Sequence, residues 1–120
     1  MSTIAPAIEQ SIAQGMTARG IDYLDAPVSG GDIRAQAGIL SMMVGGKVPV
    51  LERARPVLEV IGRRITHCSP HGTGQATKLC NQILVGGRLL ATCKAILFAQ
   101  EQGLDPNTVI RTIEGGTGDS

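Results

Sequence analysis

The sequence predicts a mixed α/β region over residues 1–69 that passes, near Pro70, into an all-helical region over residues 70–120. Three observations lead to this fold class. Apolar residues recur at helical spacing in two segments of the first region. Short apolar runs bounded by glycine or proline follow those segments, as is typical of strands. Beyond Pro70 the spacing of apolar residues stays helical almost to the end of the chain.

The first helix is predicted from Pro6 to about Arg19. Isoleucine or methionine recurs there at every fourth residue, and proline suits the first turn of a helix. The segment 21–27 then alternates toward an apolar strand. We expect Pro27 to close this strand, because proline has no N–H to donate to the neighbouring strand.

The rest of the α/β region follows the same logic. Gly38–Gly46 is predicted to form a buried strand, 48–61 an amphipathic helix and 63–69 a third strand. A sheet of three short strands with two helices leaves one face poorly covered. The chain also opens on Ser2 and Thr3 as if it were leaving a strand, so we expect the sequence to begin in the middle of a domain.

The helical region is predicted to contain one long helix from about Gly74 to Gln102. Its apolar residues lie almost all round the helix, which is typical of a helix packed between others. A shorter helix is expected after Gly103, with Asp105 as its N-cap and Pro106 at its first position.

Composition restricts the class of protein. The hydrophobic fraction of 42% and the charged fraction of 18% are typical of a globular chain. A net charge of +1, with no tryptophan, one tyrosine and one phenylalanine, does not favour nucleic acid as a partner. The apolar run 83–98 is interrupted by Arg88 and Lys94, so we expect no membrane span. Three widely spaced cysteines and no secretory signal indicate a cytoplasmic protein without disulfides or a metal site.

A first candidate site follows the first predicted strand. Ser29, Gly30 and Gly31 offer a hydroxyl and successive backbone N–H groups that no side chain shields, which suits a small carboxylate. The alternative is a tight turn that only reverses the chain.

A second candidate site lies at the start of the long helix. Lys78 shares one helical face with Asn81 and Gln82, three and four residues further on. Such a polar face must meet water, a partner or a substrate, since burial without partners is unfavourable. The alternative is that Lys78 extends to solvent and Asn81 bonds to the backbone. The nearby His67 and His71 are interpreted as structural residues.

Three segments together resemble a known family. In their order and spacing, "STIAP", "LDAPVSGGDIRAQAGILSMMVGG" and "GTGQATKLCNQ" resemble the β-hydroxyacid dehydrogenases, which include 3-hydroxyisobutyrate dehydrogenase and tartronate semialdehyde reductase. The resemblance spans essentially the whole chain. It implies reversible hydride transfer between NAD or NADP and a short hydroxy acid, in a homo-oligomeric parent enzyme. It further implies that residues 1–69 are the second half of a Rossmann-type dinucleotide-binding domain and that residues 70–120 begin an all-α domain.

The resemblance also implies residue roles. Lys78 is similar to the family's catalytic lysine, which exchanges a proton with the reacting oxygen. A cationic amine there would also stabilise a developing alkoxide. Substrate contacts and one cofactor contact on the nicotinamide side are implied for the remaining positions: Ser29, Gly30, Gly31, Asn81 and Gln82 for substrate, and Thr3 for the cofactor.

Departures from the family pattern refine the expectation. Many relatives carry two asparagines where this chain has Asn81 and Gln82. This difference favours the tartronate semialdehyde reductase branch, and 3-hydroxyisobutyrate dehydrogenase is the alternative. Lys94 replaces a common glutamate, which puts helix packing or subunit contacts in doubt. The G-x-G-x-x-G fingerprint for pyrophosphate is absent, so we expect an internal fragment with weak or no NAD(P) turnover of its own. A non-catalytic binding module, disfavoured by Lys78, and an inactive truncated product are the alternatives of another class.

Overall fold

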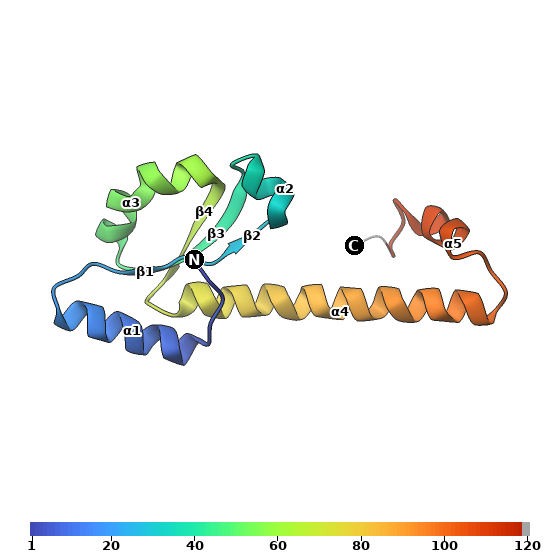
Figure 1. The fold of residues 1–120 in the computed structure, drawn as a ribbon, viewed down its shortest axis with the longest axis horizontal. Helices are drawn as coiled ribbons and strands as arrows, with labels where there is room; N and C mark the ends of the chain where they lie inside the picture. The colour runs from blue at the N-terminus through green and yellow to red at the C-terminus, as the bar shows by residue number, and fades with distance from the viewer. Residues whose placement is uncertain (119–120) are drawn as a thin grey trace. The chain divides into compact units, whose positions relative to one another are not determined.

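The structure, a computed structural model, describes residues 1–118, which fall into two compact units divided between Gln82 and Ile83. The first unit is α/β and the second is helical. The predicted boundary between residues 69 and 70 remains a prediction. The elements of the first unit, coloured from blue to yellow in Figure 1, are α1 (Pro6–Ala18), β1 (Leu24–Asp25), β2 (Val28–Ser29), α2 (Gly31–Gln36), β3 (Leu40–Gly46), α3 (Val48–Ile61), β4 (Gly62–Ser69) and the start of α4 (Thr73–Glu101).

The sheet of the first unit is organised around β3. β1 and β2 pair antiparallel with it one after the other, from Leu24 opposite Gly46 to Ser29 opposite Ser41. β4 pairs parallel with β3. Because β1 and β2 occupy one edge of β3, β4 lies along the other edge. The mixed α/β prediction for this part of the chain is confirmed.

The first strand ends before Pro27, in agreement with the prediction, but the second strand β2 after the proline was not predicted. The chain resumes pairing as β2 directly after Pro27, whose carbonyl accepts a hydrogen bond from the Met43 N–H at 3.0 Å. A proline removes only its own donor, and its carbonyl still serves the ladder. The result is a short interruption between β1 and β2. The other predicted helices and strands of residues 1–69 are confirmed to within about two residues, a normal difference for element ends.

α3 covers one face of the sheet and forms the apolar core (Figure 1). Leu51 and Leu58 pack from the helix against Met42 and Val44 of β3, and Ala26 completes the cluster. Leu51 is 2% and Val44 0% exposed. Burial of one such aliphatic side chain contributes about 1.5–3 kcal/mol, so this cluster is the main apolar stabilisation of the unit.

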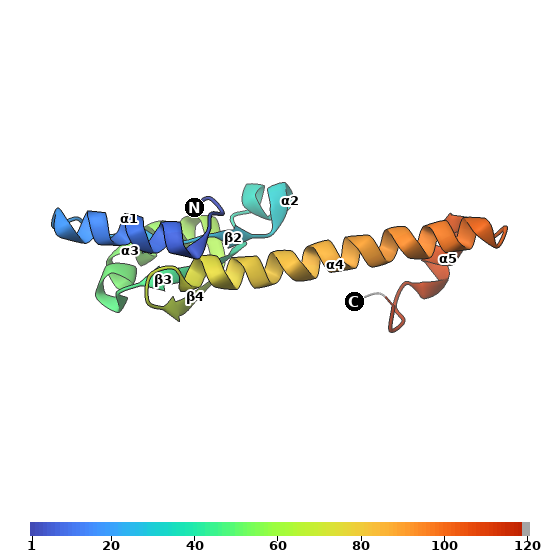
Figure 2. The same cartoon turned by 90° about the horizontal axis from the view of Figure 1, so that it is seen from below.

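The opposite face of the sheet receives the start of α4. Successive residues of a strand point to opposite faces, so Met42 and Val44 turn toward α3 while Met43 lies on the other side. Gly74 of α4 approaches the β3 backbone so closely that a Cβ atom there would collide with the Met43 carbonyl oxygen. α1 runs beside the first turns of α4 in both views of the ribbon (Figures 1 and 2).

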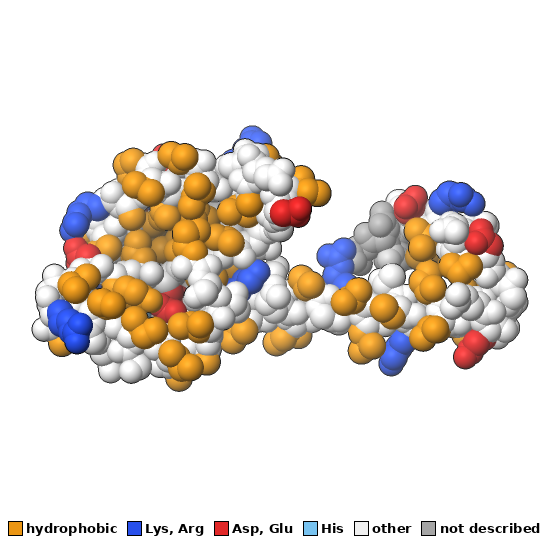
Figure 3. All heavy atoms as spheres, in the orientation of Figure 1, with side chains coloured by type: hydrophobic (Ala, Val, Ile, Leu, Met, Phe, Trp, Pro, Cys, Tyr) orange, Lys and Arg blue, Asp and Glu red, His pale blue; other side chains and the backbone are white. Residues whose placement is uncertain are grey.

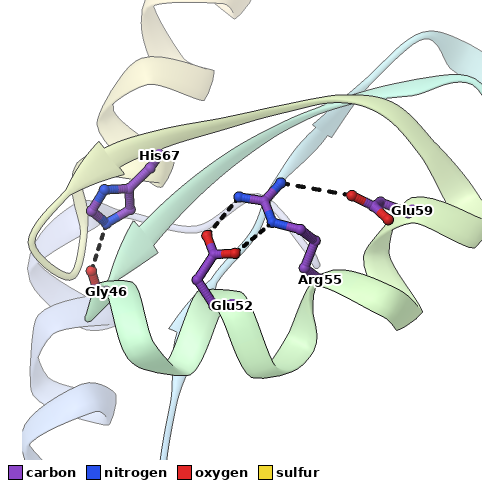
Figure 4. Close-up of polar contacts among 5 residues, drawn as sticks. All are labelled: Gly46, Glu52, Arg55, Glu59 and His67. Atoms are coloured by element: carbon purple, nitrogen blue, oxygen red, sulfur yellow. Dashed lines mark hydrogen bonds and ion pairs between the residues drawn. The ribbon is translucent and has the colours of Figure 1, made fainter.

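Figure 4 shows two separate groups of polar contacts on this side of the sheet, one within α3 and one between β3 and β4. The Arg55 guanidinium donates two hydrogen bonds, of 2.7 and 2.8 Å, to the Glu52 carboxylate. Its Nη1 also forms an ion pair with Glu59 Oε1 at 3.8 Å. The hydrogen bond from Arg55 lowers the pKa of Glu52. A ring nitrogen of His67 lies 2.8 Å from the Gly46 carbonyl oxygen, so this histidine joins β4 to the end of β3, in agreement with a structural role.

The second unit consists of the rest of α4 and of α5 (Pro106–Ile113). Asp105 caps α5 by accepting hydrogen bonds from the backbone N–H groups of Asn107 and Thr108, at 3.3 and 3.0 Å. Hydrogen bonds, first from the Thr108 hydroxyl, lower the pKa of this carboxyl. The predicted cap and the predicted first position of Pro106 are therefore confirmed.

The long helix was expected to be packed between others, but within residues 1–118 most of the apolar side chains of α4 are exposed. α4 is 29 residues long with a mean hydropathy of 1.4 in its most apolar window, so by length and composition alone it is long and apolar enough to cross a membrane. A mostly buried core helix of a soluble protein satisfies the same criterion, whereas 6% of this window is buried within residues 1–118. Figure 3 shows apolar side chains along this helix, and those exposed include Ile83, Leu84, Leu89, Leu90, Leu97 and Phe98. Cys80 and Cys93 are exposed as well.

The close approach at Gly74 gives a direct test of how α4 sits on the sheet. Gly74→Ala places a methyl group against the Met43 carbonyl and 2.7 Å from an Asp25 oxygen, so we expect a loss of about 1–3 kcal/mol in the free energy of unfolding. Gly86→Ala on the same helix is the matched control, since nothing lies within 4 Å of its added Cβ. It should stabilise by about 0.5–1 kcal/mol. Urea unfolding followed by circular dichroism measures both, and equal effects would contradict the packing described.

Candidate functional site

The start of α4 is held by one buried carboxylate. Asp25, which is 2% exposed, accepts a hydrogen bond from the Gly72 N–H at 2.9 Å through Oδ1. Its Oδ2 accepts from the Gln75 N–H at 3.0 Å. These are two of the N–H groups that a helix leaves without partners at its first turn, and a carboxylate there also faces the positive end of the helix dipole. Asp25 therefore fixes the start of α4 to the end of β1.

Gln75 extends this network to the beginning of the chain. Its side-chain oxygen accepts from the Ile4 N–H at 3.2 Å, and its Nε2 donates to the Ser2 carbonyl at 2.8 Å and to Glu9 at 3.3 Å. Gln75 is 2% exposed and Glu9 3%. Every buried polar atom of the glutamine amide thus has a partner.

Tyr23 closes the network from the side of α1. Its hydroxyl donates to the Glu9 carboxylate at 2.5 Å, and its ring lies 6.0 Å from the ring of His71. Burial, followed by the hydrogen bond to Glu9, raises the pKa of Tyr23 to about 12. The phenol is therefore a stable donor over the physiological range.

Lys78 lies one helical turn beyond Gln75. It and Asn81 are half-buried, while Gln82 is exposed. The Asn81 amide donates to the Gln82 side-chain oxygen at 3.3 Å, so these two neighbours form a pair rather than a bond to the backbone. Within residues 1–118 the ammonium group of Lys78 has no hydrogen-bond or ion-pair partner. It is a charged amine at the border between packed structure and solvent.

The glycine pair lies at the end of β2. Ser29 is the last residue of that strand, Gly30 caps α2, and both glycines have positive φ values, 141° and 66°. A Cβ at Gly30 would lie 2.8 Å from a side-chain carbon of Arg34, so only glycine lets α2 begin there. Gly31 is exposed and Ser29 and Gly30 are half-buried. Backbone and hydroxyl groups are thus accessible, although the turn itself also needs both glycines.

The first unit therefore contains every predicted site residue, with unequal connections among them. Thr3 is tied to the Lys78 helix, because Gln75 binds both of its neighbours, and its own side chain is exposed. Within residues 1–118, no hydrogen bond joins the Ser29–Gly31 segment to Lys78, Asn81 or Gln82. Their joint action on one substrate stays a prediction.

Thr3 carries an exposed hydroxyl on a loop that Gln75 joins to the first turn of α4. A hydroxyl of this kind is chemically able to bind the carboxamide of a nicotinamide ring. Its contact with the cofactor stays a prediction. A strand followed by G-x-G-x-x-G and a helix, the pattern that binds pyrophosphate, does not occur within residues 1–118.

Sequence reasoning missed the buried residues that support this site. Asp25, Glu9 and Gln75 are not among the site residues that the sequence predicts. One signal was present: Gln75 occupies the third position of α4, where a glutamine side chain commonly reaches back across the helix start. An acidic residue inside an apolar strand is a second signal, because a buried carboxylate requires donors.

Comparison with known proteins identifies the family. Residues 1–69 match the model described as the NAD binding domain of 6-phosphogluconate dehydrogenase. Residues 72–120 match the NAD-binding model of NADP-dependent 3-hydroxyisobutyrate dehydrogenase. The chain belongs to the β-hydroxyacid dehydrogenase family. The expected Rossmann-type fold with a following helical segment is confirmed, and the family's cofactor is NAD or NADP.

Individual relatives agree with this family. The chain is 45% identical over 116 residues to the 2-hydroxy-3-oxopropionate (tartronate semialdehyde) reductase of Escherichia coli, covering 97% of this chain and 40% of that protein. It is 44% identical over 117 residues to a 3-hydroxyisobutyrate dehydrogenase of Pseudomonas aeruginosa, covering 98% and 39%. Thus the chain spans about two fifths of the length of these relatives.

A solved structure shows the same fold. The 3-hydroxyisobutyrate dehydrogenase of Mycobacterium tuberculosis, solved with L-serine, is 39% identical and superposes with a TM-score of 0.87. The match covers 99% of this chain and 41% of that one.

Removal of the buried carboxylate tests the cap on α4. Asp25→Ala leaves two buried N–H groups without acceptors, so we expect the free energy of unfolding to fall by about 2–4 kcal/mol. Asp22→Ala is the control, because its ion pair with Arg53 is exposed and should contribute at most about 1 kcal/mol. Chemical unfolding of both variants, with hydrogen exchange at Gln75, measures the difference. Unchanged protection of Gln75 in Asp25→Ala would contradict the cap.

Titration of the single tyrosine tests the Glu9 side of the network. Tyrosinate absorbance should report a pKa of about 12 in the folded chain and near 10 after unfolding in denaturant. Because the folded pKa is the higher one, the associated stability is complete below about pH 10 and is lost as the pH rises through about 12. Glu9→Gln should move the folded value toward 10, and an unshifted titration in the parent chain would refute the hydrogen bond.

Proposed function

We propose that this chain carries the substrate and proton-transfer residues of an NAD(P)-dependent hydroxyacid dehydrogenase. The observation that supports the proposal best is Lys78. Its half-buried amine has no partner among residues 1–118, and it lies near the start of a helix that a buried carboxylate fixes. Membership of the β-hydroxyacid dehydrogenase family supports it independently. Bound NAD(P) would supply or accept the hydride.

In this proposal Lys78 is the general acid and base. During reduction of a semialdehyde its ammonium group donates a proton to the carbonyl oxygen, and during oxidation the neutral amine accepts the hydroxyl proton. A positioned proton donor of this kind contributes about 10²–10⁴-fold to the rate. Asn81, paired with Gln82, orients the substrate beside it.

The remaining roles follow the family resemblance. Ser29 and the accessible backbone of Gly30 and Gly31 bind the substrate carboxylate, and Thr3 contacts the nicotinamide side of the cofactor. The accessibility of these groups supports the assignment. From the family resemblance we further propose that the parent enzyme is a homo-oligomer. The three free cysteines agree with a location in the cytoplasm.

Of the two substrates, we favour tartronate semialdehyde. The exposed Gln82 beside Asn81 provides an additional amide, which suits a small substrate that carries its own hydroxyl. The alternative is 3-hydroxyisobutyrate, and the nearly equal identities of 45% and 44% to enzymes of the two types keep it in consideration. Isolated residues 1–120 are expected to show weak or no turnover.

The proposal is tested in a chimera in which this chain replaces the 116 matched residues of the Escherichia coli reductase. The chimera should reduce tartronate semialdehyde with NADH or NADPH. Lys78→Met should lower kcat by at least about 10²-fold because the proton donor is lost, with little change in cofactor affinity. Lys94→Met, an exposed lysine of the same helix, is the matched control and should retain full activity.

Two outcomes would count against the proposal. Equal kcat for the parent chimera and Lys78→Met would exclude the lysine as the acid. A chimera that binds NADPH but turns over no hydroxy acid or semialdehyde would favour a non-catalytic binding module instead.

A further inference from the structure

The environment of Gln75 carries an inference that rests on the proposed function. The buried side chain of Gln75 binds the carbonyl of Ser2 and the N–H of Ile4, at 2.8 and 3.2 Å. These two backbone groups belong to the residues on either side of Thr3. A single amide thus pairs with the backbone around Thr3 as a neighbouring strand would.

Gln75 is itself held from three directions. Its N–H donates to Asp25, its second side-chain hydrogen is directed to Glu9, and Glu9 in turn accepts from Tyr23. The side chain is 2% exposed, so water does not compete for these hydrogen bonds. The position of the Thr3 backbone is therefore defined relative to the first turn of α4.

The same turn carries the proposed catalytic amine. Lys78 follows Gln75 by three residues, which places both on neighbouring positions of one helical face. A helical turn is rigid, so the anchored Thr3 loop and Lys78 are linked by one short and stiff connection. We propose that Gln75 is a positioning residue. It keeps Thr3, and through Thr3 the nicotinamide ring, at a fixed distance from Lys78.

The chemistry explains why such a link matters. Hydride transfer and protonation act on adjacent atoms, the carbonyl carbon and its oxygen, so the groups that hold the hydride source and the acid must keep a fixed separation. Displacement by about 1 Å can cost on the order of 10²-fold in rate. Glutamine suits the task because only an amide donates and accepts at once, whereas glutamate has no N–H for the Ser2 carbonyl.

The test uses two variants of Gln75 and one control. Gln75→Met keeps the length of the side chain and removes all three hydrogen bonds. Gln75→Asn keeps a neutral amide beside Glu9 but shortens the side chain by one methylene, which draws it away from Ser2 and Ile4, so it remains informative if the methionine variant does not fold. Gln14→Met, an exposed glutamine of α1, is the control.

Hydrogen exchange on residues 1–120 provides the first readout, which needs no activity. The Ile4 amide should exchange at least about 10-fold faster in Gln75→Met than in the parent chain, and at the parent rate in Gln14→Met. Unchanged Ile4 exchange in Gln75→Met would overturn the inference at its structural step.

Kinetics of the chimera described above provide the second readout. In both Gln75 variants the rate of hydride transfer should fall on the order of 10- to 100-fold. The isotope effect with 4-deuterated NADPH should rise, because hydride transfer becomes slower relative to the other steps. The pH dependence of kcat should keep its shape, because Lys78 is intact. A purely structural glutamine would instead lower the melting temperature and leave the hydride rate of the folded enzyme unchanged.

The two levels of the hypothesis fail differently. If Lys78→Met turns over as fast as the parent chimera, the proposed function falls. If Lys78→Met is inactive and folded Gln75 variants transfer hydride at the parent rate, only the positioning role of Gln75 falls.

Discussion

The hydrogen bonds from the first turn of α4 to the buried Asp25 carboxylate are the interaction on which the rest of the first unit depends. They join an element with few apolar contacts to a sheet whose apolar core lies on the opposite face, under α3. Burial of a carboxylate is unfavourable unless donors compensate for the lost water, and the free N–H groups of a helix start are suitable donors. The carboxylate thus supplies acceptors for the helix N–H groups, and these N–H groups supply donors for the buried carboxylate.

Glycine makes this arrangement possible. Gly74 lets the α4 backbone approach the Met43 carbonyl and the Asp25 carboxylate more closely than any residue with a Cβ would allow. The glycines of "HGTG", which the sequence indicates only as a turn, therefore have a packing function. The same closeness brings Gln75 within reach of Ser2 and Ile4, so the polar network and the glycine contact depend on each other.

Sequence patterns predicted the helices and strands well because each one has a strong local cause. α3 follows its apolar spacing, and α5 follows the Asp105 cap and the proline after it. The resumption of the strand after Pro27 was not predictable, since it depends on a carbonyl that accepts from β3. The connections of Gln75 were equally hidden, because they join residues separated by more than 60 positions. The candidate amine and glycines were found from local features, whereas the network that positions them is tertiary.

Burial decreases along one face of α4, from residues that pack on the sheet to residues with partial access to solvent. Gly74 and Gln75 are buried, Lys78 and Asn81 are half-buried, and the intervening Thr77 and Cys80 are exposed. The buried and half-buried positions are three or four residues apart, so they form one stripe along the helix. In the first turn the stripe contacts the sheet and Asp25, and in the next two turns the same stripe bears an amine and an amide with partial access to solvent. A lysine placed one turn earlier would be a buried cation, and one placed two turns later would be an ordinary surface charge. The spacing from Asp25 through Gln75 to Lys78 therefore determines both how firmly the amine is held and how open it remains to a substrate.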